Sequence, residues 1–126
     1  MDSDAEQWMG FARYDLRTAQ AMVRTKRYRY VIFCSQQAIE KCLKALIAAR
    51  TGKMPPRIHD LERLADVAGV TLSLEDKRFF LLLTQFYIES RYASPASGKT
   101  RITRAATARE VLRQTRKAME WLRSML

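Results

Sequence analysis

The stretch that decides the fold is Phe33-Cys34-Ser35-Gln36-Gln37-Ala38-Ile39-Glu40-Lys41-Cys42-Leu43-Lys44-Ala45, a strong helix-forming segment. On a helix of about 3.6 residues per turn, its polar side chains share one face and most other positions are apolar or small. The polar face consists of Gln37, Glu40, Lys41 and Lys44. Because so wide an apolar arc contacts several neighbours, we expect this helix to be central in the fold.

This central helix is predicted over about residues 28–50, because Gly52 is a natural stop. Before it, a first helix is predicted from Ser3, which forms a capping box with Glu6, to about residue 25. Apolar residues recur along this first helix with the rhythm of a core-facing stripe. They are Trp8, Phe11, Ala12, Leu16, Ala19, Met22 and Val23.

After the central helix, a short helix is predicted over about residues 59–67, ending at Gly69. A fourth helix is predicted to begin at Ser73, a good N-cap. Residues 79–88 of this helix are apolar almost all round, so it must be covered on more than one side. We therefore expect it either at the centre of the bundle or against a second copy of the chain.

A loop is predicted over about residues 91–102, because that segment is rich in Ser, Ala, Pro, Gly and Lys. The last helix is predicted to begin near Thr103 or Thr107, and Thr107 would form a capping box with Glu110. The pattern predicts an all-α fold: an antiparallel up-and-down bundle of four long helices plus one short helix. The whole chain, residues 1–126, forms a single domain of this kind.

The composition is that of a basic globular protein. The 126 residues carry a net charge of +10, with 29% charged and 48% hydrophobic residues. The longest apolar run, residues 79–83, is far too short to span a membrane, and the acidic N-terminus predicts no secretory signal. Cys34 and Cys42 would lie about 12 Å apart along one helix, too far for a disulfide. We therefore expect a cytoplasmic protein with no membrane association.

Four short patterns occur in a fixed order along the chain. They are Trp8-x-x-Phe11-Ala12-x-x-Asp15-Leu16-x-x-Ala19, the Gln36 to Ala45 segment, His59-Asp60-Leu61-x-x-Leu64, and Tyr87-Ile88-Glu89-Ser90-Arg91-Tyr92. As a set they resemble the HEPN family of small helical proteins. The resemblance implies a homodimer that is often encoded beside a minimal nucleotidyltransferase, the pair acting as a toxin–antitoxin module. Many members of the family are metal-independent RNases that use an Arg-x(4–6)-His motif.

This sequence departs from that RNase motif. Its only histidine is His59, and no histidine follows Arg91 at the required spacing. Cleavage through the 2′-hydroxyl needs a proton acceptor beside a cation that stabilises the phosphorane. We therefore expect a protein that binds nucleotide or RNA without a catalytic residue, and His59 to be a helix-start residue with local hydrogen bonds. The alternative is a metal-independent endoribonuclease in which His59 and Arg91 meet in space.

The predicted ligand site is a polar groove for a phosphate or for an acidic side chain of a partner. Within it the basic residues would hold phosphate, and the amide and carboxylate would orient them. The groove residues are Gln37, Glu40, Lys41, Lys44, His59, Arg91 and Tyr92. Residue chemistry alone favours a plainer account, since Glu40 and Lys44 form an i, i+4 ion pair typical of a solvated helix face.

Towards the C-terminus the positive charge is dense enough to attract a polyanion such as RNA. The predicted basic surface is Lys99, Arg101, Arg109, Arg113, Arg116 and Lys117. An equally good account is a solvated helix face, because no aromatic residues suited to base stacking are interleaved there. Neither a metal site nor a cofactor is expected, since one His and two Cys offer no chelating spacing.

Overall fold

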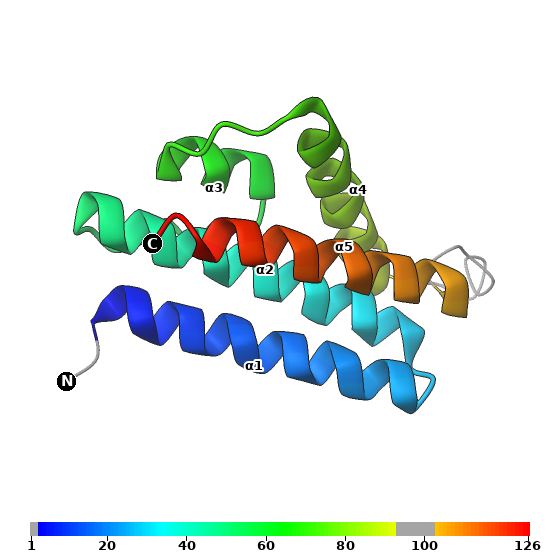
Figure 1. The fold of residues 1–126 in the computed structure, drawn as a ribbon. Helices are drawn as coiled ribbons and strands as arrows, with labels where there is room; N and C mark the ends of the chain where they lie inside the picture. The colour runs from blue at the N-terminus through cyan, green and yellow to red at the C-terminus, as the bar shows by residue number, and fades with distance from the viewer. Residues whose placement is uncertain (1–2, 93–102) are drawn as a thin grey trace.

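The computed structural model describes residues 3–92 and 103–126, which form five helices (Figure 1). In chain order these are α1 (Asp4–Arg24), α2 (Tyr28–Thr51), α3 (Leu61–Ala68), α4 (Leu74–Arg91) and α5 (Ala105–Arg123). Within the described residues there is no strand. The predicted all-α fold, with four long helices and one short one, is confirmed.

The centre of the molecule is α2, as predicted. It contacts each of the other four helices. Figure 1 shows α1 along one side of α2, α3 and α4 on the opposite side, and α5 across its front. Large apolar side chains of α2, such as Ile32, Ile39 and Leu43, are completely buried between these neighbours. The apolar arc of α2 therefore organises the whole core.

Helix ends follow local capping chemistry at most positions. The hydroxyls of Ser3 and Ser73 accept hydrogen bonds from the backbone N–H of Glu6 (3.1 Å) and Asp76 (3.0 Å), as predicted. Asp60 caps α3 in the same way, so α3 begins two residues later than the predicted start at His59. These caps explain why three of the five helices begin where they do.

The start of α5 lies between the two predicted positions, Thr103 and Thr107. This helix begins at Ala105 with Arg104 as its N-cap, and no side chain bonds to its first turn. The proposed capping box of Thr107 and Glu110 is wrong, because Thr107 already lies inside the helix. The buried residues of α5 are Ala108, Val111, Leu112, Thr115, Ala118, Met119 and Leu122, and their spacing places α5 against α2.

The helix α1 is oriented differently from expectation, and α4 leaves part of its apolar surface uncovered. On α1 the predicted core residue Phe11 is 54% exposed, and Met9 is buried instead. On α4, Phe80 is fully buried but Leu81 and Ile88 are each 52% exposed. The apolar character of α4 thus extends beyond the face that packs on the chain itself. Among the described helices, none is long and apolar enough to cross a membrane.

Candidate functional site

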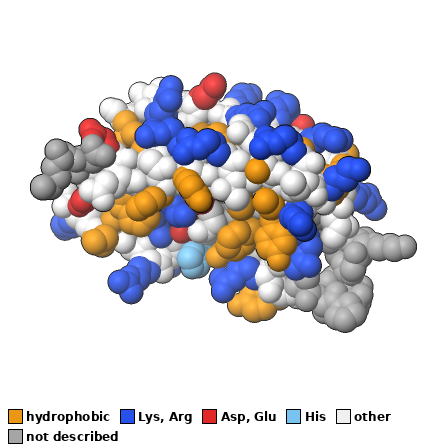
Figure 2. All heavy atoms as spheres, turned by 90° about the horizontal axis from the view of Figure 1, so that it is seen from below, with side chains coloured by type: hydrophobic (Ala, Val, Ile, Leu, Met, Phe, Trp, Pro, Cys, Tyr) orange, Lys and Arg blue, Asp and Glu red, His pale blue; other side chains and the backbone are white. Residues whose placement is uncertain are grey.

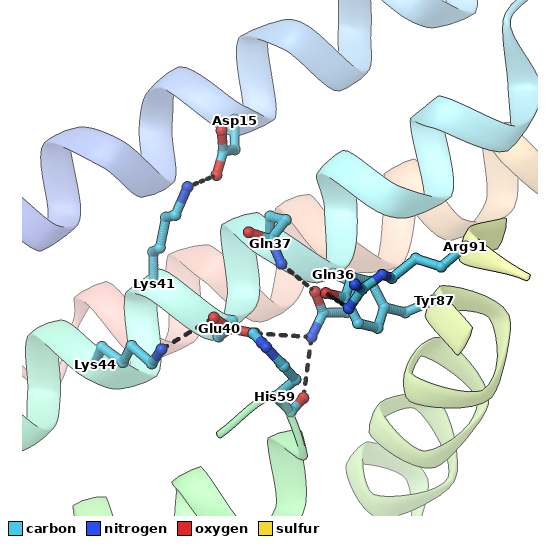
Figure 3. A network of polar contacts seen from close by, with 9 residues as sticks. All are labelled: Asp15, Gln36, Gln37, Glu40, Lys41, Lys44, His59, Tyr87 and Arg91. Carbon is cyan, nitrogen blue, oxygen red and sulfur yellow. Dashed lines mark hydrogen bonds and ion pairs between the residues drawn. The ribbon is translucent and has the colours of Figure 1, made fainter. Parts of the chain in front are cut away.

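A buried carboxylate, Glu40, is the centre of a polar cluster between α2, the start of α3 and the end of α4 (Figure 3). One of its oxygens, Oε1, lies 2.9 Å from His59 Nδ1 and accepts a hydrogen bond from Gln36 Nε2 (3.1 Å). The other oxygen, Oε2, lies 3.1 Å from Lys44 Nζ. A carboxylate this buried is tolerated because it has three polar partners.

Gln36, Glu40 and Lys44 follow one another at four-residue intervals, so they form a buried polar row along a single face of α2. Gln36 is completely buried, and besides Glu40 it donates to the backbone carbonyl oxygen of His59 (3.0 Å). This residue was missing from the predicted site. The clue in the sequence was the pair of adjacent glutamines, one of which had to face the apolar side of the helix.

His59 is held at two points but remains accessible. Its backbone carbonyl accepts from Gln36, its ring nitrogen Nδ1 contacts Glu40, and its side chain is 53% exposed. None of the described residues bonds to its other ring nitrogen, Nε2. His59 precedes the N-cap Asp60, so the start of α3 sets its position. The expected local hydrogen bond of His59 is therefore replaced by one to a residue of α2.

Tyr87 joins His59 to Arg91 and was also missing from the predicted site. The centroids of the His59 and Tyr87 rings lie 5.7 Å apart, and the Tyr87 ring stacks on Phe33 at 5.4 Å. Arg91 Nη1 donates to the Tyr87 hydroxyl (3.2 Å), with its guanidinium carbon 5.6 Å from the same ring. Figure 3 shows Tyr87 and Arg91 reaching from α4 toward the polar row of α2. His59 and Arg91, distant in sequence, thus lie against one tyrosine.

Lys44 and Tyr92 occupy the two ends of the cluster. The Lys44 side chain is only 9% exposed, and its Nζ lies 5.6 Å from the centroid of the Trp8 ring on α1. The predicted ion pair with Glu40 is present, but its predicted solvated location is wrong, because both side chains are buried. Tyr92 is 73% exposed and touches the cluster through the Arg91 guanidinium, 5.8 Å from its ring.

Two of the predicted groove residues point elsewhere. Lys41 Nζ lies 2.5 Å from Asp15 Oδ2 and so ties α2 to α1, away from Glu40 (Figure 3). Gln37 is half-buried and donates to Gln36 Oε1 (2.8 Å), which makes it a neighbour of the cluster with no contact to His59 or Arg91. The four polar residues predicted to share one face of α2 therefore divide between two of its sides.

The predicted basic residues of α5 also divide between two surfaces. All four, Arg109, Arg113, Arg116 and Lys117, are exposed. Arg109 and Arg116 line hollows against α1, whereas Arg113 and Lys117 line a cleft against the start of α4. The other two predicted members, Lys99 and Arg101, lie outside the described residues.

One of these α5 arginines is neutralised within the helix. Arg113 forms a bidentate pair with Glu110 (2.6 and 3.0 Å). Hydrogen bonds from Arg113 and Gln114 lower the pKa of Glu110 to about 2, so the pair is charged at neutral pH.

The two cysteines are unsuited to nucleophilic chemistry. Burial, assisted by the carboxylate of Asp15, raises the pKa of the Cys34 thiol to about 11. Burial also raises the pKa of Cys42 to about 12. Both thiols are therefore protonated at neutral pH and poor nucleophiles. In residues 3–92 and 103–126, no three His, Cys, Asp or Glu side chains are grouped to hold a metal ion.

The five-helix fold of the described residues, with a buried polar cluster on its central helix, defines a class of small helical protein. Comparison with known proteins identifies the family. Residues 5–125 match the HEPN domain family, so the chain belongs to that family. The structure is similar to the crystal structure of TT1696 from Thermus thermophilus. The TM-score is 0.86 at 29% identity, and the match covers 99% of this chain and 100% of that one. Among curated proteins, no sequence matches the chain.

Proposed function

We propose that this HEPN protein binds a phosphate group of a nucleotide or RNA between His59 and Arg91. The observation that carries the proposal is their common contact with Tyr87, which brings an accessible ring nitrogen and an exposed guanidinium to one place. Guanidinium groups match phosphate oxygens in geometry and charge. The imidazolium form of His59 adds a second donor, because its Nδ1 donates to Glu40 while Nε2–H donates to the phosphate. The exposed ring of Tyr92 beside Arg91 would stack on a base.

The remaining cluster residues support this site from below. Glu40 orients the His59 ring through Nδ1, so Nε2 is directed to a ligand. Lys44 is already neutralised by Glu40 and nearly excluded from solvent, so it acts as a structural counter-ion. The binding function therefore rests on His59, Arg91 and Tyr92, with Gln36 and Glu40 as positioning residues.

In the cell we propose a cytoplasmic two-gene module of the toxin–antitoxin type, with a minimal nucleotidyltransferase as partner. This proposal is supported by the chain's membership of the HEPN family, because members of that family are often encoded beside a minimal nucleotidyltransferase. We further propose a homodimer, supported by large hydrophobic side chains left at the surface, including Phe11, Tyr14, Ile88 and Tyr92. Figure 2 shows hydrophobic side chains gathered in the middle of one face of the molecule.

Changing Arg91 to Gln is expected to weaken binding of ATP or a short single-stranded RNA by roughly tenfold, since a charged hydrogen-bond donor to phosphate is lost. Fluorescence polarisation and calorimetry at fixed salt concentration would measure both affinities. The matched control is Arg78→Gln, which removes an equally exposed charge from the same helix outside the cluster. Equal affinity of the wild type and Arg91→Gln, or no binding of either probe, would contradict the proposed site.

A second candidate function, a metal-independent endoribonuclease, is favoured by one feature of the cluster. The buried carboxylate of Glu40 holds Nδ1 of His59 while Nε2 faces outward, an arrangement suited to a general base. Arg91 would stabilise the charge that develops on the phosphorane.

If this second function holds, the protein cleaves RNA in the presence of EDTA and His59→Ala abolishes the cleavage. The measurement is gel electrophoresis of end-labelled RNA, with Arg78→Gln again as the control. RNA that stays intact for hours with the wild-type protein would exclude this function and leave binding as the role of the cluster.

A further inference from the structure

We infer that a groove between α1 and α5 docks an acidic amphipathic helix of a partner protein. Two adjoining hollows of about 420 and 270 Å³ make up the groove, and both are lined by Gln20 and Arg116. Figure 1 shows α1 and α5 running in opposite directions along the front of the molecule. None of the residues lining the groove belongs to the Glu40 cluster, so this surface is separate from the proposed phosphate site.

The apolar floor of the groove has the spacing of a coiled coil. From α1 it receives Met9, Leu16 and Val23, each seven residues after the last, and from α5 it receives Leu112 and Met119, also seven apart. Leu16 and Val23 are half-buried, and the other three are buried beneath them. A seven-residue apolar repeat keeps its side chains in line with a neighbouring helix. The span from Met9 to Val23 is about 21 Å, so an occupant of about two heptads would fill it.

Arginines border this floor on both sides. On α5, Arg109, Arg116 and Arg123 repeat at the same seven-residue interval, and Arg13 and Arg24 stand opposite on α1. Charges that flank an apolar seam at this spacing select the partner in coiled coils by pairing with opposite charges. The matching pattern on a partner is a helix with apolar residues along one side and Glu or Asp next to them.

Within residues 3–92 and 103–126, no carboxylate neutralises these five arginines. None of them has a carboxylate within ion-pair distance in the described part of the chain, in contrast to Arg113 with its bidentate Glu110. Among the described residues that line the groove, Glu120 alone is acidic. With the Gln20 amide oxygen facing the guanidinium, Arg116 donates to it from Nη2 (2.9 Å) and Nε (3.1 Å), which holds Arg116 across the groove.

The arginines and the apolar floor of the groove together favour one kind of binding partner. A second copy of this chain docked groove to groove would set its own five arginines against these, and like charges repel. A nucleic-acid backbone would meet the arginines but leave its phosphates over methionine and leucine side chains, which offer neither hydrogen bonds nor stacking. An acidic amphipathic helix satisfies both the arginines and the apolar floor.

The test uses the full chain labelled with carbon-13 at its methionine methyl groups. The probe is a designed two-heptad helical peptide with Leu at its seam and Glu beside it. A scrambled peptide of the same composition and a short RNA duplex serve as comparisons. Met9 and Met119 line the groove from below, with 4% and 6% of their surface exposed, whereas Met54 is 80% exposed and lines neither hollow. Reversing two groove charges in Arg109→Glu/Arg116→Glu is matched by Lys77→Glu/Arg78→Glu, an equal change of net charge on α4.

The expected result is that the amphipathic peptide shifts the Met9 and Met119 resonances and leaves Met54 unchanged. Its affinity should fall roughly tenfold in Arg109→Glu/Arg116→Glu but not in the α4 control. Equal binding of the scrambled peptide, unmoved Met9 and Met119 signals, or larger shifts of these two signals with the RNA duplex than with the peptide would each overturn the inference. The methyl shifts are measured on the wild-type chain, so the test stands even if the groove variant folds poorly. Loss of phosphate binding in Arg91→Gln has no bearing on these outcomes, so the two proposals fail separately.

Discussion

Replacing Glu40 with alanine is expected to lower the free energy of unfolding by about 3–5 kcal/mol, because it leaves a buried ammonium group without its counter-ion. The Lys44 side chain is 9% exposed and the Glu40 side chain 5%, so water cannot replace the lost carboxylate. Gln36 and His59 lose a hydrogen-bond partner in the same change. Urea denaturation followed by circular dichroism measures the loss, and the melting temperature should fall by roughly 10–20 °C.

Two further variants isolate the buried ion pair as the cause. In Glu40→Ala/Lys44→Met the stranded charge is also removed, so we expect the double variant to recover about 1–3 kcal/mol relative to Glu40→Ala. The matched surface control is Glu110→Ala, which breaks the ion pair with Arg113 at a solvent-exposed position and should leave stability unchanged. A Glu40→Ala variant as stable as Glu110→Ala would show that Lys44 is hydrated and that the cluster is open to solvent.

At high dilution, where the chain is monomeric, Phe80→Ala is expected to lower the free energy of unfolding by about 3–5 kcal/mol, while the adjacent Leu81→Ala lowers it by less than about 0.5 kcal/mol. Phe80 is fully buried and belongs to the main core cluster, so truncation leaves a cavity beside α2 and α3. Leu81 is 52% exposed and loses only a surface contact. The same denaturation measurement, made on both variants, compares neighbouring positions of one helix.

The pair of variants also tests the homodimer proposal. If a second copy covers the exposed side of α4 at Leu81, then Leu81→Ala lowers stability in a manner that depends on protein concentration, and sedimentation shows more monomer. If α4 packs only within its own chain, Leu81→Ala is silent at every concentration. Equal losses from Phe80→Ala and Leu81→Ala at high dilution would contradict the observed orientation of α4.

Helix existence and most helix ends were predictable because their signals are local. A serine before an acidic first turn caps a helix wherever it stands, as Ser3 and Ser73 do. Gly52 ends α2 with φ 67° and Gly69 ends α3 with φ 72°, a backbone conformation that glycine adopts without strain. Only the capping box of α5 was wrong, because Thr107 offers a good local signal, while packing against α2 begins the helix two residues earlier, at Ala105.

Core orientation was harder to predict where apolar residues are abundant. On α1, a small rotation of the helix about its axis decides whether Met9 or Phe11 faces the core. The periodicity predicted the larger side chain, Phe11, but Met9 is the buried one. On α4 the run from Phe79 to Leu83 gives no polar face to mark the outside. Only the direction from which α2 and α3 approach distinguishes Phe80 from Leu81, and that direction is a property of the whole bundle.

The helical class and the central place of α2 were predictable from the sequence alone. The sequence also placed Glu40, Lys44, His59 and Arg91 among the candidate site residues. These follow from periodicity, capping and the family resemblance, which are carried by short segments. Only the tertiary structure decided that Gln36 and Tyr87 join the cluster, that Lys41 turns to Asp15, and that Glu40 and Lys44 are buried. The physical reason is that burial and pairing depend on which helix covers a face, and contacts between distant segments settle that.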